Sequence, residues 1–363
     1  MEILFEVKNS TGVITLNRPK ALNALNLNMA IQLSKKLKEW EGDNKVERVI
    51  LLGGGNHFCA GGDVKSVHLS GPFSELKREF FSKEYSLNLQ IKKFPKPYLS
   101  IWKGVVMGGG VGLSIYGDYR IATDSTKFAM PETSIGFFPD VGGSFFLSRM
   151  ENNIGKYLGL TGELIQCKDL LNFGLATHYC PEDKLEILIN QYILDGSIVS
   201  HEIKNYSSFS EEKLDFINKN FTGDIYAILK KISAKQDQDN LLDRLLSKCP
   251  MSLAVTTLLI KNSNNRSLKK CLEIEYRLSQ KMTNRHDFGE GIQAVLIEKH
   301  HNPKWKPKTI DEINNNIKKR INDVIRLFIF IFGLLCLLTV WLSCVLMQFR
   351  VCCRKFYPKF MYN

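Results

Sequence analysis

Two carboxylates stand in an otherwise apolar segment, MPETSIGFFPD, which covers residues 130–140. Burying a carboxylate is costly and raises its pKa toward the neutral range, where the group can exchange a proton during catalysis. Glu132 and Asp140 are therefore candidates for acid/base chemistry. The segment permits another interpretation, in which Asp140 follows Pro139 as the N-cap of a helix and the carboxylates only mark helix starts.

Two glycine clusters each follow a predicted buried strand and precede a predicted helix: FCAGGD at residues 58–63 and MGGGVG at residues 107–112. Backbone N–H groups at a helix N-terminus are suited to stabilising an oxyanion, and two from different corners of a fold would hold one carbonyl oxygen. Neither cluster completes GxGxxG or contains GK[ST], so nucleotide binding is disfavoured. Taken singly, either cluster is equally compatible with a tight turn.

The segments that must position these residues alternate between strand and helix patterns. The predicted strands are 4–7, 13–16, 48–52, 98–106, 119–122 and 127–130, and the predicted helices are 26–40 and the stretch from Gly112 onward. Such alternation indicates an α/β core with layered sheets. After about residue 190 the strand pattern fades, and residues 211–248 and 252–300 are predicted to be helical. We therefore expect a core over 1–190 and a helical cover over 191–308.

The net charge of +12 is concentrated at the C-terminal end. Residues 303–363 contain 11 Lys and Arg against 3 Asp and Glu, a net of +8, which leaves +4 for residues 1–302. The nearly balanced body has no dense basic face, so we expect no nucleic-acid binding. The nine cysteines form no CxxC pair and the histidines form no HExxH, so we expect no metal site and a reducing compartment.

The C-terminal end contains a candidate transmembrane helix. Residues 327–347 form a run of 21 residues without a charge, about 31 Å long as a helix, which is enough to cross a membrane. A basic linker, 309–326, precedes it and a basic tail, 348–363, follows it. The opposite end has the pattern of strands, and no signal or transit peptide is visible. The run therefore predicts a membrane partner through 327–347, with a buried core helix as the alternative.

Together with NRPKALNAL at 17–25, EYRLSQ at 275–280 and DFGEGIQAVLIEKHHNPKWKP at 287–307, the three loop motifs make the sequence similar to the crotonase (enoyl-CoA hydratase/isomerase) superfamily. The resemblance covers nearly all of residues 1–308 and is greatest to the 3-hydroxyisobutyryl-CoA hydrolase subgroup. It implies an α/β fold with a ββα spiral core and a helical C-terminal region, to which the chain adds the C-terminal apolar helix. It also implies thioester hydrolysis in valine catabolism, with coenzyme A entering as part of the substrate and no separate cofactor.

The resemblance assigns roles to five residues. The N–H groups of Gly62 and Gly109 would form the oxyanion hole, Glu132 would be the base or nucleophile, and Asp140 would be its partner. Glu84, in KEYSLN, would contact the substrate. The substrate-binding set is therefore Glu84, Gly109, Glu132 and Asp140.

Two features depart from the pattern of the superfamily. Gly112 occupies the position of the hydratases' other glutamate, which argues against the enzymatic alternative, an enoyl-CoA hydratase or isomerase. The C-terminal run leaves open a second alternative, a non-catalytic, membrane-tethered acyl-CoA-binding protein. The resemblance implies a mitochondrial location.

Three lysines near the motifs are candidates for contacts with CoA phosphates: Lys20, Lys65 and Lys103. The alternative is that they are ordinary surface lysines.

Overall fold

The computed structural model describes residues 1–203, 207–235, 240–313, 319 and 323–325. The chain divides into two units, Met1–Asn314 and Asn315–Asn363, and the elements named here belong to the first. The predicted apolar helix over 327–347 and the tail over 348–363 lie outside the described residues, as does half of the linker over 309–326. Within the ranges that are described, no helix has both the length and the apolar character needed to cross a membrane.

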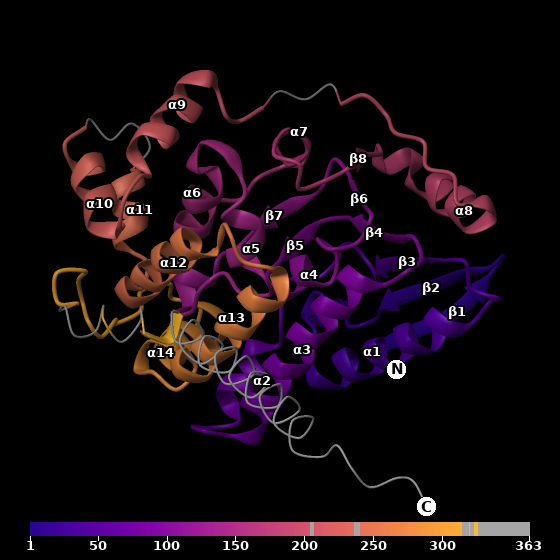
Figure 1. Cartoon of the computed structure of the whole chain (residues 1–363), viewed down its shortest axis with the longest axis horizontal. Coiled ribbons are helices and arrows are strands. Elements are labelled where there is room, and N and C mark those ends of the chain that lie inside the picture. The colour runs from indigo at the N-terminus through magenta and orange to yellow at the C-terminus, as the bar shows by residue number, and fades with distance from the viewer. Residues whose placement is uncertain (204–206, 236–239, 314–318, 320–322, 326–363) are drawn as a thin grey trace, which may run out of the picture. The chain divides into compact units, whose positions relative to one another are not determined.

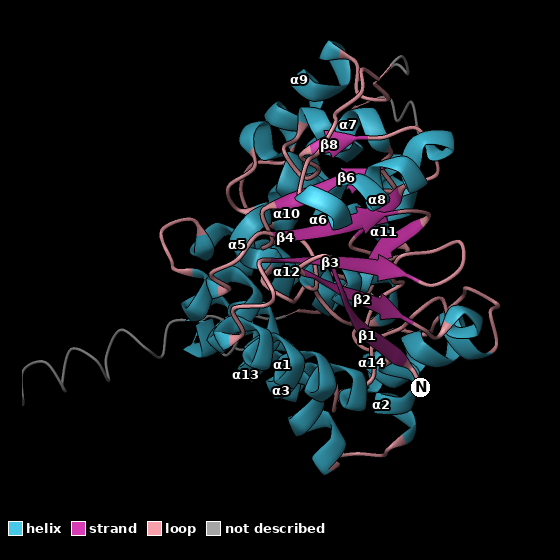
Figure 2. Cartoon of the chain, turned by 90° about the vertical axis from the view of Figure 1, so that its right-hand side faces the viewer, coloured by secondary structure: helices cyan, strands magenta, loops and turns pink. Residues whose placement is uncertain are grey.

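The described strands form two sheets. The larger sheet has the order β1-β2-β3-β4-β6-β8, with β1 and β2 antiparallel and the later pairs parallel, and the smaller sheet pairs β5 with β7 in parallel. Figure 2 shows the larger sheet with its strands side by side in this order. The bounds are β1 Ile3–Lys8, β2 Thr11–Leu16, β3 Arg48–Gly53, β4 Tyr98–Trp102, β5 Val105–Met107, β6 Tyr119–Ala122, β7 Lys127–Ala129 and β8 His178–Tyr179.

The pattern of hydrophobic residues in the sequence explains why β4 and the first helix form. β4 is buried at every position, as expected of a central parallel strand covered on both faces. Helix α1 (Leu27–Gly42) buries the stripe predicted from the sequence, with Ala30, Leu33, Leu37 and Trp40 all inside, and Asn26 caps its N-terminus by accepting a hydrogen bond from the Met29 N–H.

The structure corrects two predicted elements next to the second glycine cluster. The single strand expected over 98–106 is divided into β4 and β5, which belong to different sheets. Gly104 lies between them with φ +59°, and a Cβ there would lie 2.2 Å from the Asn56 carbonyl oxygen, so the chain changes direction where only glycine fits. The helix expected from Gly112 onward is instead α4 (Gly109–Gly112), followed by turns.

The C-terminal half is helical, as predicted, but in shorter pieces than expected. Figure 1 shows α13 beside α3 and α14 beside α2, and both pairs are in contact. The boundary at residue 190 stays a prediction.

The bounds of the helices other than α1 and α4 are α2 Val64–Leu69, α3 Glu75–Lys93, α5 Gly143–Leu147, α6 Ile154–Thr161, α7 Cys167–Asn172, α8 Leu185–Asp195, α9 Glu211–Asn220, α10 Ile225–Ser233, α11 Leu241–Leu246, α12 Pro250–Ser263, α13 Leu268–Met282 and α14 His286–Ile292. Short 3-10 helices are η1 Pro19–Ala21, η2 Glu132–Ile135, η3 Glu151–Asn153 and η4 Glu182–Lys184, and a π-helix, η5, covers Gln293–Ile297.

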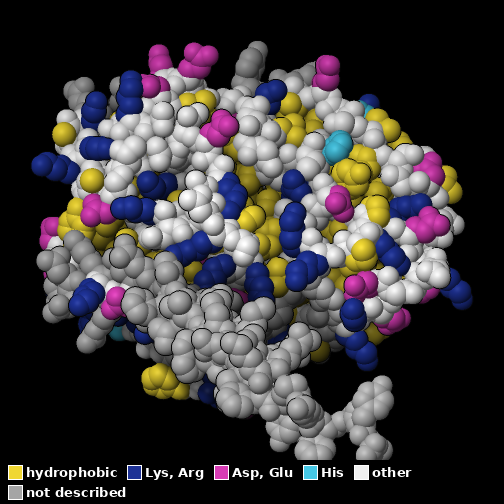
Figure 3. Space-filling view, in the orientation of Figure 1, with side chains coloured by type: hydrophobic (Ala, Val, Ile, Leu, Met, Phe, Trp, Pro, Cys, Tyr) yellow, Lys and Arg dark blue, Asp and Glu magenta, His cyan; other side chains and the backbone are white. Residues whose placement is uncertain are grey.

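Charged side chains of both signs lie on the face seen in Figure 3, with Lys and Arg gathered near its middle. Some helix ends of the C-terminal half carry basic residues, such as Lys261 in the last turn of α12 and Lys281 in the last turn of α13. Basic residues near helix C-termini are favourable for the helices themselves. The expectation of no nucleic-acid binding stays a prediction.

Candidate active site

One cavity of about 590 Å³ is lined by all five residues that the sequence singled out: Gly62, Glu84, Gly109, Glu132 and Asp140. They come from five separate segments. Gly62 precedes α2, Glu84 lies on α3, Gly109 begins α4, Glu132 begins η2, and Asp140 lies in the loop before α5. The fold therefore brings together every predicted site residue.

Parallel pairing places the two glycine corners side by side. The Cys59 N–H donates to the Val105 carbonyl at 3.0 Å, and the Met107 N–H donates to the Cys59 carbonyl at 3.0 Å. Neighbouring parallel segments end at the same edge of a sheet, so the two segments turn into helices next to each other. Gly61 and Gly108, which come just before the two site glycines, have φ values of +124° and +45°, conformations that a side chain would oppose.

The gap between Gly62 and Gly109 is too small for a side chain. A Cβ on Gly109 would lie 2.8 Å from the Gly62 nitrogen and 2.4 Å from Glu84 Oε1. Among the described residues, neither glycine N–H donates a hydrogen bond to the protein. Two unused backbone donors close together in the lining of one cavity are what an oxyanion hole requires.

Glu132 is the first residue of η2, so the helix-start interpretation was correct for its position in the chain. Its carboxylate nevertheless lines the cavity and is only 6% exposed. Oε2 is buried without a hydrogen-bond partner in the described part of the chain, and Oε1 would lie 2.9 Å from a Cβ on Gly108. The absence of a side chain at Gly108 therefore lets Glu132 approach the second glycine cluster.

Asp140 is not a helix cap, so that interpretation of the sequence was wrong. The N-cap of α5 is Gly142, and no side chain caps the helix. The Asp140 carboxylate instead accepts a hydrogen bond from the Tyr85 hydroxyl at 2.7 Å, inside the protein. Tyr85 is a site residue that the sequence reasoning missed. Its position directly after Glu84 in KEYSLN was the available signal.

Glu84 supplies the third carboxylate. It is 2% exposed, and its Oε1 is buried and has no hydrogen-bond partner among the described residues. The alternative considered from the sequence, an exposed helical glutamate, does not describe this side chain. Oε1 lies close to both Gly62 and Gly109, since a Cβ on Gly62 would be 3.5 Å from it and a Cβ on Gly109 would be 2.4 Å from it.

The three carboxyl groups have raised pKa values. Burial is the main cause for each: it raises the pKa of Asp140 to about 7 and lifts the pKa values of Glu84 and Glu132 well above the ordinary range. The charge of Asp140 raises the pKa of both glutamates further, whereas the Tyr85 hydrogen bond lowers that of Asp140. Ionisation of one group makes ionisation of its neighbours less favourable, so the three carboxyl groups share a limited negative charge.

The rest of the cavity is largely apolar. Phe81 and Phe137, which both line it, stack with ring centroids 5.4 Å apart, and Leu296 lines it from η5. Of the three lysines considered for CoA phosphates, Lys65 lines the cavity, whereas Lys20 and Lys103 are not part of its lining. An apolar pocket with a few converging polar groups is typical of a small-molecule site.

Position 112 has no room for a catalytic side chain. A Cβ on Gly112 would lie 2.7 Å from the Val141 Cβ and 2.8 Å from Asn88 Nδ2. Val141, the residue after Asp140, thus fills the space that a longer residue at 112 would need. Val141 and Asn88 therefore leave no space for a carboxylate at position 112.

Glu275 anchors the loop that follows Asp140. It is fully buried on α13, and its carboxylate accepts from the Gly142 N–H at 2.7 Å, the Ser144 N–H at 3.0 Å and the Ser144 hydroxyl. Burial raises its pKa to about 8, while these donors oppose the shift. Val141 and Gly142 both have positive φ, +50° and +80°, so the loop needs such support. The sequence motif EYRLSQ gave no indication of this role.

No group of three or more His, Cys, Asp or Glu side chains in the described ranges could hold a metal ion. The expectation that the site needs no metal and no separate cofactor stays a prediction.

Curated relatives match most of the chain. It is 41% identical over 328 residues to the mitochondrial 3-hydroxyisobutyryl-CoA hydrolase of Danio rerio, covering 85% of this chain and 86% of that protein. It is 39% identical over 341 residues to the human enzyme of the same name, covering 87% and 88%.

Two solved structures share the fold. A carnitinyl-CoA dehydratase from Mycobacterium thermoresistibile superimposes with a TM-score of 0.83 and 36% identity over 88% of this chain and 96% of that chain. An enoyl-CoA hydratase from Rhodobacter sphaeroides 2.4.1 gives a TM-score of 0.83 and 31% identity over 88% and 97%. The family model described as enoyl-CoA hydratase/isomerase matches residues 11–321. The chain therefore belongs to the enoyl-CoA hydratase/isomerase family, the crotonase superfamily.

Proposed function

We propose that the chain is an acyl-CoA thioesterase that hydrolyses 3-hydroxyisobutyryl-CoA to 3-hydroxyisobutyrate and CoA. The observation that carries this function is one cavity whose lining combines the neighbouring glycines Gly62 and Gly109 with the buried carboxylates Glu132 and Asp140. The relatives that are 41% and 39% identical are named for this activity.

The Gly62 and Gly109 N–H groups would receive the thioester oxygen. Attack on the carbonyl carbon moves negative charge onto that oxygen, and two fixed donors in a water-poor cavity stabilise the charge as it develops. Their positions are set by the strand pairing and by the positive φ of Gly61 and Gly108, so no rearrangement is needed during the reaction.

Glu132 would deliver the attack by one of two routes. As a base it takes a proton from water while the water oxygen bonds to the carbonyl carbon; as a nucleophile its own oxygen forms that bond and gives a mixed anhydride that water then opens. In both routes the carbon–sulfur bond breaks and the CoA thiolate takes up a proton. Both need Glu132 ionised, and Asp140, with a pKa near 7, can hold the proton that Glu132 must lose.

Glu84 would contact the substrate through the 3-hydroxyl group of the acyl chain. Its buried Oε1 lacks a partner within the described residues and lies beside the oxyanion glycines, where the acyl carbons of a bound thioester would begin. Phe81 and Phe137 offer an apolar surface for the methyl branch. A hydrogen bond from the 3-hydroxyl group to Glu84 Oε1 would favour the hydroxylated substrate over an unsubstituted acyl-CoA.

An enoyl-CoA hydratase is the alternative that the names of the solved relatives suggest. Water addition in that subgroup uses a second glutamate, which the resemblance places at position 112. Val141 and Asn88 fill the space beside Gly112, so this chain has no room for it. The third possibility, a non-catalytic acyl-CoA-binding protein, gives the raised carboxyl pKa values no role.

One assay separates the three functions. Purified full-length protein is mixed with 3-hydroxyisobutyryl-CoA and, separately, with crotonyl-CoA, while free thiol and enoyl absorbance are followed. We expect thiol release from the first substrate and no loss of enoyl absorbance with the second. Hydration of crotonyl-CoA without thiol release would support a hydratase, and binding of both without any reaction would support a binding protein.

We also propose that the enzyme works in mitochondria and that residues 327–347 attach it to a membrane. The location rests on the relatives' names, and the anchor rests on the uncharged run in the sequence. Carbonate extraction of isolated mitochondria tests both. Recovery of the full-length protein in the carbonate-soluble fraction would argue against the anchor, and its absence from mitochondria would argue against the location.

A further inference from the structure

A second cavity, of about 530 Å³, lies between the loop after α2, the start of α3 and α14. It shares no lining residue with the thioester cavity. Gln293 lines the second cavity and Val295 lines the first, and residues two positions apart on a helix point in nearly opposite directions. The helical segment formed by α14 and η5 therefore separates the two cavities.

The walls of this cavity carry two basic side chains, Lys77 and Arg285, and two histidines, His68 and His286. The lining includes a single carboxylate, Glu290. Glu290 is already engaged, because its Oε1 accepts a hydrogen bond from the Lys304 N–H at 2.6 Å. The electrostatic balance at the cavity surface therefore favours a negatively charged occupant.

Lys77 is the strongest indication that the cavity accepts an anion. It is 4% exposed, and its ammonium group donates to the Thr283 carbonyl at 2.9 Å and the Asn284 side-chain oxygen at 3.4 Å. Both acceptors are uncharged, and no carboxylate among the described residues forms an ion pair with it. Thr283 ends α13, so the helix dipole offsets part of the charge, but a buried ammonium group is stabilised fully only by an anion.

Arg285 adds a second donor. One of its terminal nitrogens, Nη2, contacts Asp287 at 3.2 Å and the Lys306 carbonyl at 3.1 Å. Its Nε is buried and has no hydrogen-bond partner within the described ranges. An unused guanidinium N–H costs free energy when it is buried and is a preferred partner for carboxylate and phosphate oxygens.

Gly289 helps to keep the cavity open. A Cβ at this position would lie 3.1 Å from the His68 ring, so a side chain there would occupy the space between α2 and α14. Burial and the charge of Lys77 lower the pKa of His68, which leaves a neutral ring able to donate or accept a hydrogen bond. The volume of the cavity is sufficient for a small organic molecule.

We propose that this cavity binds a small oxyanion, a phosphate or a short carboxylate, held by Lys77 and Arg285. The site lies behind the thioester cavity and is structurally connected to it. Lys77 and Glu84 are seven residues apart on α3, which places them on the same side two turns apart, and α2 begins directly after Gly62 and Asp63. An occupant would therefore contact the rear of two segments that form the active site.

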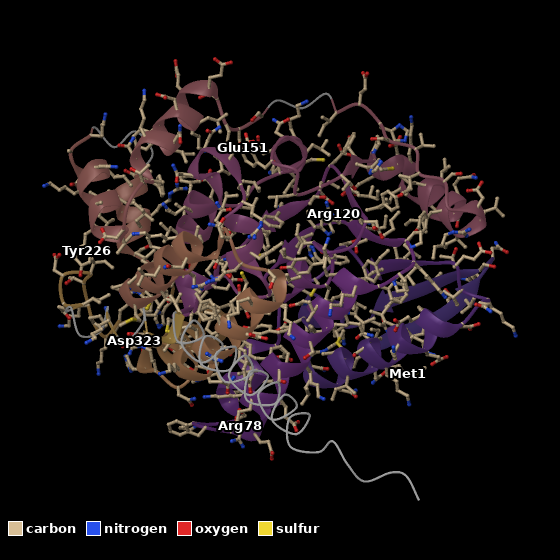
Figure 4. All side chains as sticks on the ribbon, viewed as in Figure 1. Met1, Arg78, Arg120, Glu151, Tyr226 and Asp323 are labelled. Atoms are coloured by element: carbon tan, nitrogen blue, oxygen red, sulfur yellow. The ribbon has the colours of Figure 1, made fainter. Side chains whose placement is uncertain are left out.

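Calorimetric titration of the full-length protein at constant ionic strength tests the proposal, with inorganic phosphate and 3-hydroxyisobutyrate as two separate ligands. We expect saturable binding of at least one of them, weakened about tenfold or more by Lys77→Gln and by Arg285→Gln, as loss of a charge-assisted hydrogen bond predicts. Arg78→Gln is the matched control, because Arg78 is the next residue on α3 and is exposed at the lower edge of Figure 4. This variant should bind like the wild type.

Three outcomes would overturn the proposal: no saturable binding of either ligand, equal binding by folded Lys77→Gln and wild-type protein, or displacement of the bound anion by a non-hydrolysable acyl-CoA analogue. The second outcome would mean that Lys77 only caps α13. The third would place the anion in the thioester cavity. Arg285→Gln, on another segment, keeps the test valid if Lys77→Gln does not fold, and measured thioester hydrolysis reports separately on the proposed enzymatic function.

Discussion

Glu132 and Glu163 are both largely hidden from solvent, yet the protein treats their charges in opposite ways. The Glu163 carboxylate forms ion pairs with Lys213 at 2.8 Å and Arg244 at 2.9 Å and accepts a hydrogen bond from the Tyr157 hydroxyl. Burial would raise its pKa, but these partners hold it below the usual range. Glu132 has burial without such partners, and its pKa is raised.

The difference shows that burial alone does not make a carboxylate reactive. Glu163 joins α9 and α11 to the core through fixed counter-charges, which stabilise its ionised form and remove its tendency to exchange a proton. Glu84, Glu132 and Asp140 lie near one another without such compensation, so each additional negative charge in the cavity is costly. Such a cluster is typical of a functional site.

The largest expected effect is on kcat, and it should distinguish Glu132 from Glu163. Glu132→Gln should lower kcat for 3-hydroxyisobutyryl-CoA by about 10² or more, because it removes the reacting group and keeps its volume. CoA affinity should stay within a few-fold of the wild type. Glu163→Gln, the matched change at the paired carboxylate, should leave kcat nearly unchanged. Steady-state kinetics of both folded variants check this, and normal turnover by Glu132→Gln would refute the mechanism.

Asp140→Asn should also reduce kcat, by about 10-fold to 10²-fold, because the amide cannot accept the proton of Glu132. The asparagine keeps an oxygen that can accept the Tyr85 hydrogen bond, so folding should be retained. Rates are to be compared with a thermal melt of the same sample. A folded Asp140→Asn protein with wild-type kcat would show that Asp140 is not part of the catalytic machinery.

Tyr85→Phe should shift the pH dependence. Catalysis needs an ionised carboxylate, so kcat/KM should rise with pH through a midpoint near the Asp140 pKa of about 7. The Tyr85 hydrogen bond lowers that pKa, and its removal should move the midpoint upward by about 1 pH unit, which corresponds to the loss of one hydrogen bond to a charged group. An unchanged midpoint in Tyr85→Phe would mean that Asp140 does not control this part of the profile.

Glu275→Gln should have a smaller effect on kcat, about 10-fold or less, since the substituted residue displaces the Asp140 loop without touching the substrate. The amide would place a donor against the N–H groups of Gly142 and Ser144, which now both donate to the carboxylate. Ser144→Ala removes one of the hydrogen bonds and should fall between this variant and the wild type. Equal kcat in all three proteins would show that the loop does not depend on Glu275.

The smallest expected effect is on the free energy of unfolding. It should have opposite signs at Glu84, which has no counter-charge among the described residues, and at Glu163, which is ion-paired. The pKa of Glu84 is raised on folding, so its favourable contribution exists below the ordinary carboxyl pKa and is lost as the pH rises through the raised value. The pKa of Glu163 is lowered, so its contribution exists above the ordinary value and is lost as the pH falls through the lowered one.

At pH 8, Glu84→Gln should therefore stabilise the protein and Glu163→Gln should destabilise it, each by about 1 kcal/mol or more. Both differences should shrink toward pH 4. Denaturant unfolding of wild type and variants at the two pH values measures them. A loss of stability in Glu84→Gln at pH 8 would mean that its carboxylate is compensated in solution.

Much of the fold could be predicted from local pattern. The stripe on α1 and the buried runs of β3 and β4 are periodic signals that burial on one or both sides imposes on a sequence. The break between β4 and β5 could not be predicted, because Gly104 marks a possible turn without showing which sheet the next strand joins. The subdivision of the C-terminal helices is likewise set by packing against α3 and η2.

The sequence by itself determined which chemical groups are present: two glycine corners able to turn, carboxylates in apolar segments, and Gly112 in place of a side chain. Those properties are local, because residue type fixes backbone freedom and charge. Only the tertiary structure decided that Glu84, Glu132 and Asp140 share one cavity, that Tyr85 and Glu275 support Asp140, and that Glu163 is paired. A carboxylate's pKa depends on burial and neighbouring charges, and both come from segments distant in the chain.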